Sequence, residues 1–186
     1  AFPGNRFMHT PQAEPQTALT VPLFWTRELN RITHHSDAVR SVDYSPNGKL
    51  FVTGGYDGAV IVSHADGRLF KRFGESDNEV MSVHFSPDGQ TVAAARIGGD
   101  VDLWTIKDGS RRVIETNEAV IYTVRFSPDG QYLLTGGPDN SAKLWTRRGD
   151  FVQTVGNYRE PIRSAQFIAD GSQNDSQNDS HKKARV

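Results

Sequence analysis

The sequence predicts an all-β protein built from repeated four-stranded units. Three observations predict this: a repeat of 41 residues, short apolar runs bounded by turn residues, and a polar, glycine-rich composition. The 186 residues include 17 Gly and 9 Pro, and the mean hydropathy is −0.55. Such frequent turn residues favour short strands joined by tight turns over long helices.

Four segments define the repeat, and each ends in a glycine 41 residues after the previous one. The segments are VRSVDYSPNG, VMSVHFSPDG, IYTVRFSPDG and IRSAQFIADG, which end at Gly48, Gly89, Gly130 and Gly171. The aromatic position keeps the same interval at Tyr44, Phe85, Phe126 and Phe167. A fixed period of this length indicates one supersecondary unit repeated along the chain.

The first strand of each unit is the apolar run that opens the segment. Its V-x-x-V spacing interrupts the alternation of a regular strand once, which predicts a β-bulge. The Ser-Pro-Asp-Gly sequence that follows predicts a tight turn. Proline fixes one φ angle, aspartate hydrogen-bonds its own backbone, and glycine supplies a positive φ.

The remaining strands follow at regular intervals. Second strands are predicted at 49–53, 91–95 and 131–135, and third strands at 59–63, 101–104 and 141–145. The turns between them include GGYDG and GGPDN, and weaker fourth strands are predicted at 68–72 and 151–155. Strands at this spacing with turn signals between them are typical of an all-β fold.

A four-stranded unit with aromatic-Ser-Pro-Asp-Gly after its first strand and Leu-Trp-Thr after its third resembles the WD-repeat family of β-propellers. The resemblance extends over about residues 1–171. It implies three continuous blades at 34–74, 75–115 and 116–157, plus one blade split between the termini. The split blade has strands two to four at 1–33 and its first strand at 158–171. Residues 172–186 contain a repeated polar unit and are expected to form a disordered tail.

In this family a His, a Ser or Thr, a turn Asp and a Trp form a buried hydrogen-bonded chain that braces each blade. Because these polar groups are buried away from water, they must form hydrogen bonds with one another. The residues of this sequence at those positions are His35, Thr53 and Asp57 in one blade, Trp104 in the middle blade, and Thr135, Asp139 and Trp145 in the third. No blade has the complete set, so we expect these blades to be less stable than blades of the family that have all four bracing residues.

The resemblance also implies a binding surface on one rim, built from the turns between second and third strands and the entries into first strands. Side chains there are free from core packing and can carry recognition. The predicted protein-binding residues are Arg40, Tyr56, Met81, Arg96, Ile97, Tyr122, Pro138 and Arg163.

Other classes of function find little support. The net charge is −1, so the chain lacks the excess of basic residues that is typical of proteins that bind nucleic acids or anionic membranes. There is no cysteine, and the six histidines show no metal-ligand spacing. Arg148-Gly149-Asp150 is read as a turn between strands. We expect no enzyme activity, no cofactor and, without a secretory signal, a cytoplasmic protein.

The sequence therefore predicts a non-catalytic scaffold, adaptor or sensor that binds a protein or peptide on one rim. Two structural alternatives stay open. The ends of two chains pair into an eight-bladed homodimeric ring, or the chain is a fragment of a longer propeller, as a start at Ala1 within a repeat suggests. A propeller enzyme is a third alternative.

Overall fold

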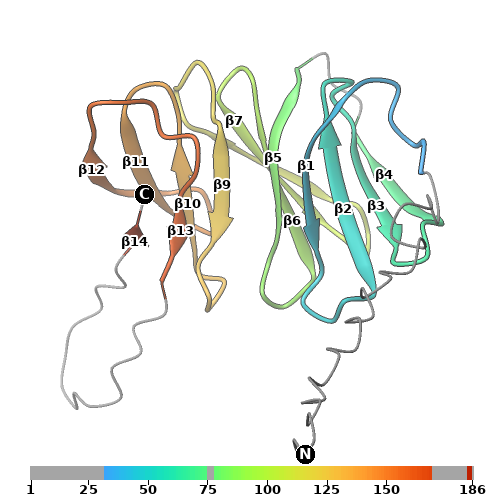
Figure 1. The fold of residues 1–186 in the computed structure, drawn as a ribbon. Coiled ribbons are helices and arrows are strands. Elements are labelled where there is room, and N and C mark those ends of the chain that lie inside the picture. The colour runs from blue at the N-terminus through green and yellow to red at the C-terminus, as the bar shows by residue number, and fades with distance from the viewer. Residues whose placement is uncertain (1–31, 75–77, 169–183, 186) are drawn as a thin grey trace, which may run out of the picture. The chain divides into compact units, whose positions relative to one another are not determined.

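The computed structural model describes residues 32–74, 78–168 and 184–185, and these residues form strands without any helix (Figure 1). The predicted all-β fold is therefore confirmed. Strands β1 to β12 form three four-stranded sheets, and β13 and β14 form a two-stranded sheet. The three larger sheets do not close into a ring within the described residues.

Each four-stranded sheet contains strands in chain order. The first sheet contains β1 (Val39–Tyr44), β2 (Leu50–Gly55), β3 (Val60–His64) and β4 (Leu69–Phe73). The second contains β5 (Val80–Phe85), β6 (Thr91–Arg96), β7 (Asp100–Thr105) and β8 (Arg111–Glu115). The third contains β9 (Thr123–Phe126), β10 (Tyr132–Gly136), β11 (Ser141–Thr146) and β12 (Phe151–Asn157). β13 (Gln166–Phe167) pairs with β14 (Ala184–Arg185).

Local sequence signals explain the strand ends. The predicted bulge is present in β1, where the register against β2 shifts between Val39 and Ser41, and at the equivalent place in β5. The predicted turn follows β5: the Gly89 N–H donates to the Ser86 carbonyl at 2.8 Å. Gly89 has a φ of 67°, which glycine adopts without steric cost.

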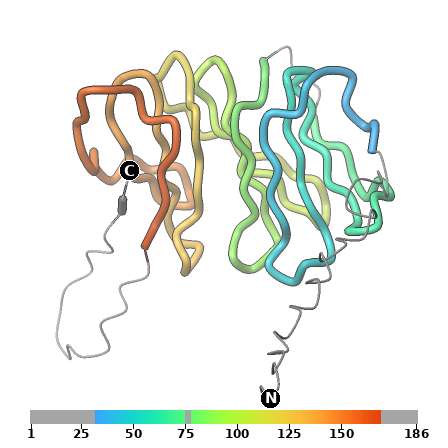
Figure 2. Tube along the Cα trace, viewed as in Figure 1, coloured from blue at the N-terminus to red at the C-terminus, as the bar shows by residue number. Residues whose placement is uncertain are grey.

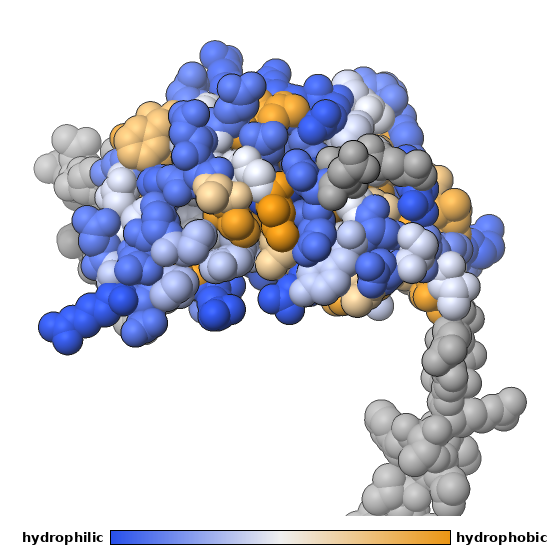
Figure 3. Space-filling model, turned by 90° about the horizontal axis from the view of Figure 1, so that it is seen from above, coloured by the Kyte–Doolittle hydropathy of each residue, from blue (hydrophilic) through white to orange (hydrophobic). Residues whose placement is uncertain are grey.

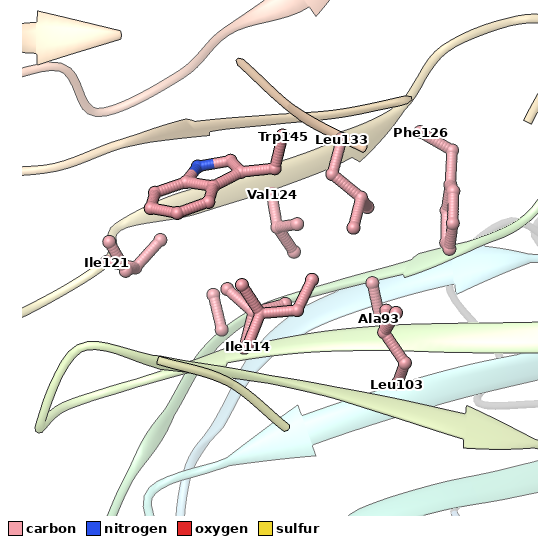
Figure 4. Packing of buried hydrophobic residues seen from close by; sticks show 10 residues of the cluster. Ala93, Leu103, Ile114, Ile121, Val124, Phe126, Leu133 and Trp145 are labelled. Atoms are coloured by element: carbon pink, nitrogen blue, oxygen red, sulfur yellow. The ribbon is translucent and has the colours of Figure 1, made fainter. Parts of the chain in front are cut away.

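Hydrophobic side chains fill the space between successive sheets. The cluster between the first and second sheets contains Val52, Val60, Val62, Phe73, Val80, Val83, Phe85, Val92 and Ala94. The cluster between the second and third sheets, shown in Figure 4, contains Ala93, Ala95, Val101, Leu103, Ile114, Ile121, Val124, Phe126, Leu133 and Trp145. The middle sheet therefore packs on both faces, and every residue of β6 is buried. Burial of this apolar surface is the main stabilising contribution.

The first strands of the three sheets lie side by side (Figures 1 and 2). Hydrogen bonds from backbone to side chain join them. The Val83 N–H donates to Ser41 Oγ at 3.1 Å, and one interface later the Val124 N–H donates to Ser82 Oγ at 3.3 Å. Each first strand thus offers side-chain acceptors to outward-facing N–H groups of the next.

The three sheets follow one another in a row, and residues 162–167 continue this row beyond the third sheet. Ile162 and Ala165 are buried against Leu134 of β10 and Ala142 of β11. Gly136 makes room for this contact, because a Cβ at that position would lie 2.3 Å from Ile162 Cγ2. The segment therefore packs where the first strand of a next sheet is expected.

Two expected regions fall mostly outside the described residues. Strands two to four of the split blade, expected at 1–33, are outside them except for 32 and 33. The expected disordered tail, 172–186, is outside them except for β14.

At the other end of this row of sheets, β1 has a face that none of the described sheets covers. The β1 side chains on this face are Val39, Val42 and Tyr44, which are 52%, 59% and 60% exposed. Their equivalents one repeat later, in β5, are at most 2% exposed. β1 therefore has the side chains of an inter-sheet interface, and none of the described sheets covers them.

Candidate functional site: the rim and the buried braces

The candidate site is the rim where the first strands begin and the turns after the second strands lie. Figure 3 views this rim, on which hydrophobic side chains lie among hydrophilic ones. Backbone hydrogen bonds fix the turns. The Tyr56 N–H donates to the Ala38 carbonyl, and the Ile97 N–H donates to the Glu79 carbonyl, both at 3.0 Å. The backbone at Tyr56 and Ile97 is therefore fixed by these hydrogen bonds.

All but one of the predicted rim residues have exposed or half-buried side chains. The exposed ones are Arg40, Tyr56, Pro138 and Arg163, and the half-buried ones are Met81, Ile97 and Tyr122. The structure brings two of them together, since the Arg163 guanidinium lies 5.7 Å from the centre of the Tyr122 ring. This distance fits a cation–π contact between the third sheet and the segment that follows it.

Arg96 is the exception, and the expectation that it contributes to an exposed rim is wrong. Its side chain is 2% exposed, and its Nε donates to Oδ2 of the fully buried Asp102 at 2.7 Å. Its Nη1 donates to the carbonyls of Gly58 and Asn78, both at 2.9 Å. A buried charge requires such partners. Arg96 therefore links the first two sheets instead of facing a binding partner.

A buried polar brace lies directly behind the rim of the first sheet. His35 Nε2 lies 2.8 Å from Thr53 Oγ1, and its Nδ1 lies 2.8 Å from Asp57 Oδ1. Burial raises the pKa of Asp57, but hydrogen bonds from His35 and from the N–H groups of Ser36 and Ala59 outweigh it. The pKa of Asp57 therefore lies below its ordinary value, and its carboxylate is ionised at neutral pH.

The third sheet contains a shorter brace. Trp145 Nε1 donates to Thr135 Oγ1 at 2.9 Å. Asp139 lies outside it: its carboxylate accepts from the Ser141 N–H and hydroxyl and pairs with Lys143 Nζ at 2.9 Å. The physical reason is that this sheet has no histidine to connect the carboxylate to Thr135.

The repeat, the three sheets and the partial braces agree with the comparison to protein families. The family model described as WD domain, G-beta repeat matches residues 26–62, 67–105 and 110–146, which together are more than half of the chain. The chain belongs to the WD-repeat family. A search of curated proteins finds no match to this WD-repeat chain.

The middle WD blade departs furthest from the bracing pattern. Trp104 Nε1 is buried and has no hydrogen-bond partner among the described residues. Ala94 explains this, because it occupies the repeat position that Thr53 and Thr135 occupy in the other blades. The polar link of this blade is the Arg96–Asp102 pair, which sequence reasoning missed.

In the described part of the chain, no group of three His, Cys, Asp or Glu residues is placed to hold a metal ion. No helix in that part is long and apolar enough to cross a membrane. WD repeats generally mediate protein–protein interactions. The rim offers aromatic, aliphatic and arginine side chains, which are suited to that role.

Proposed function

We propose that this WD-repeat protein is a non-catalytic adaptor or sensor that binds a protein or peptide over the rim. The observation that carries the proposal is the set of exposed Arg40, Tyr56 and Arg163, the last of which lies against half-buried Tyr122. Arginine, tyrosine and methionine are enriched at protein interfaces, because they combine large contact area with polar or adaptable contacts.

The rim also favours a particular partner chemistry. Tyr56 is 39% exposed, and its backbone N–H donates to the Ala38 carbonyl. Arg40 is exposed and has no carboxylate partner in the described residues. A partner segment that places an acidic side chain next to an apolar or aromatic one would satisfy both features. The proposed partner is therefore an acidic protein segment with at least one large apolar residue.

Affinity capture with the full chain tests the proposal. The rim variant is Tyr56→Ala with Tyr122→Ala, and the control is Leu69→Ala with Phe70→Ala on β4, where both side chains are also exposed. We expect proteins captured by the wild type and by the control to be lost from the rim variant, while both variants keep the wild-type thermal unfolding curve. An identical set of captured proteins from all three would refute the rim as the binding site.

The uncovered face of β1 favours a second function, in which the repeats assemble with a further blade. Val42 and Tyr44 occupy the positions of Val83 and Phe85, whose N–H groups donate to Ser41 and Asp43 of the preceding sheet. A blade supplied by a second copy or by a longer propeller chain would bury the same face in the same way.

Light scattering separates these cases. A homodimer of about twice the 20.6 kDa chain mass that dissociates in Val42→Lys, but persists in Lys49→Glu on the adjoining exposed turn, supports assembly of two chains. A monomer whose stability is unchanged by Val42→Lys contradicts it, because a lysine in a covered blade interface would be strongly destabilising.

A further inference from the structure

The hydrogen bonds that join the first strands of successive sheets use a different acceptor at each seam. A seam is the contact between two neighbouring first strands, β1 with β5 or β5 with β9 (Figure 1). At the β1–β5 seam, the Phe85 N–H donates to Asp43 Oδ2 at 2.8 Å. At the β5–β9 seam, the Phe126 N–H donates to His84 Nδ1 at 3.1 Å. Asp43 and His84 occupy equivalent positions of the 41-residue repeat, so the two seams differ in the chemistry of this acceptor.

The acceptor at the β5–β9 seam depends on the protonation state of a histidine. An ionised carboxylate accepts hydrogen bonds at both oxygens, whereas a ring nitrogen of histidine accepts only when it carries no proton. The contact with the Phe126 N–H therefore requires a neutral His84 whose single ring proton is on Nε2. A second proton, on Nδ1, places two N–H donors opposite each other and ends the hydrogen bond.

Charged groups on both sides determine which strand attracts a protonated His84. On β1, Asp43 Oδ2 lies 3.9 Å from His84 Nε2. On β9, Arg125 Nη1 donates to Ser82 Oγ at 3.4 Å, and the charge of this arginine lowers the pKa of His84. The partner of His84 on β6 is Ala93, which has no charge. A protonated His84 is therefore attracted by Asp43 and repelled by Arg125.

The Phe126 ring connects His84 to one further charged pair. The centres of the His84 and Phe126 rings are 6.1 Å apart, and the Arg147 guanidinium lies 5.9 Å from the centre of the Phe126 ring. Arg147 Nη1 pairs with Asp88 Oδ2 at 3.0 Å. Because Asp88 offsets the charge of Arg147, we expect Asp43 and Arg125 to dominate the electrostatic environment of His84.

The other contacts between the second and third sheets do not depend on this proton. At the rim end, the Gly98 N–H donates to the Ala119 carbonyl at 2.9 Å, and Ile97 forms a bridge with Val120. The apolar cluster between these sheets contains no titratable side chain. Loss of the His84 contact therefore loosens the first strands locally and leaves the two sheets packed against each other.

We propose that His84 is a proton-operated switch between neighbouring sheets. When it is neutral, His84 accepts from the Phe126 N–H and joins β5 to β9. When it is protonated, His84 releases this N–H and forms an ion pair with Asp43 of β1. The switch operates at acidic pH, because burial, opposed by Asp43 and aided by Arg125, lowers the pKa of His84 to about 4.

Hydrogen–deuterium exchange of the full chain, followed by NMR from neutral pH down to about pH 3, tests this switch. The quantity measured is the protection factor of each amide, which corrects for the pH dependence of exchange itself. We expect protection of the Phe126 amide to fall at least about tenfold, with the same midpoint as the ring signal of His84. The Phe85 amide, which donates to Asp43, should stay protected through that midpoint.

Two variants should move this midpoint in opposite directions. Asp43→Asn removes the charge that attracts protonated His84 but keeps an oxygen acceptor for the Phe85 N–H, so the midpoint should move to lower pH. Arg125→Gln removes the repelling charge and keeps a side-chain donor, so the midpoint should move to higher pH. His84→Asn keeps an acceptor that does not titrate, and its Phe126 amide should stay protected over the whole range.

The switch would be overturned by a Phe126 amide whose protection does not follow the His84 titration. Midpoints that stay in place or move in the same direction in Asp43→Asn and Arg125→Gln would also overturn it. Loss of protection at Phe85 and Phe126 together, at one pH, would show global unfolding and refute a local switch.

Discussion

His35 Nδ1 lies 2.8 Å from Oδ1 of Asp57, and both side chains are almost fully buried. This contact ties the segment before β1 to the turn after β2. Asp57 also accepts hydrogen bonds from the N–H groups of Ser36 and Ala59. It therefore fixes both the segment before β1 and the turn after β2, which meet at the rim. Because Tyr56 precedes Asp57, the brace of the first blade also positions a proposed binding residue.

Asp57→Ala should therefore lower the free energy of unfolding by about 2 kcal/mol, because it leaves His35 and two backbone N–H groups without their acceptor. Urea denaturation measures this loss. The control is Asp66→Ala, which removes an exposed carboxylate paired with Arg68 and should cost much less than Asp57→Ala. Equal losses in the two variants would show that the brace contributes nothing specific.

The unpartnered indole of Trp104 predicts a difference between two substitutions of Ala94. Ala94→Thr places a hydroxyl where Thr135 accepts the hydrogen bond from Trp145. Ala94→Val is the matched control, because valine has nearly the same shape without the hydroxyl. We expect the threonine variant to be more stable than the valine variant by about 1 kcal/mol in thermal or urea unfolding. A valine variant of equal or greater stability would contradict the equivalence of the two positions.

The Arg96–Asp102 pair should behave as a buried ion pair. Arg96→Met should cost about 3 kcal/mol, because it removes the most buried partner of a fully buried carboxylate. Arg96→Met with Asp102→Leu should recover a large part of that loss, since no buried charge is left unpaired. Urea denaturation of both variants completes the comparison. A double variant less stable than Arg96→Met would contradict this account.

His84 predicts a pH dependence. It accepts a hydrogen bond from the Phe126 N–H at Nδ1, 3.1 Å away, and it lies between Asp43 and Arg125. Burial, opposed by Asp43 and aided by Arg125, lowers the pKa of His84 from 6.5 to about 4. Between these two pH values the unfolded chain binds a proton that the folded chain does not.

The stability that neutral His84 provides is therefore full above about pH 6.5 and is lost as pH falls towards and through 4. The slope from this one group is at most about 1.4 kcal/mol per pH unit. His84→Asn keeps an acceptor near the Nδ1 position but does not titrate, so its unfolding free energy should fall less steeply over that range. Parallel profiles for wild type and variant would rule out His84 as the titrating group.

Much of the fold follows from the 41-residue register. Gly48, Gly89 and Gly130 each close the same turn, and the strands between them follow in the predicted order. The register also predicts which bracing groups can meet, as His35 and Thr53 do. These features are local, or repeat at a fixed interval, so the sequence alone displays them.

Burial at the ends of strands was less predictable. Arg96 is next to Ile97 in the predicted rim, but its side chain turns inward to Asp102. A signal was present: where the middle repeat has Arg96 and Asp102, the first has Gly55 and Ile61 and the third has Gly137 and Lys143. A charged pair that appears in one repeat at two inward positions indicates a buried ion pair. The exposed face of β1 depends on what packs against it, which no local pattern encodes.

The most direct test of the account is site-specific photo-crosslinking at the rim. A photoreactive phenylalanine replaces Tyr56 in one version of the full chain and Phe70 of β4 in another, and each is irradiated in cell extract. The account predicts a discrete crosslinked protein at Tyr56 that is absent at Phe70 and is lost when Tyr122→Ala and Arg163→Gln are added. Crosslinks that are identical at the two positions, or that persist in the added variant, would contradict a binding site on this rim.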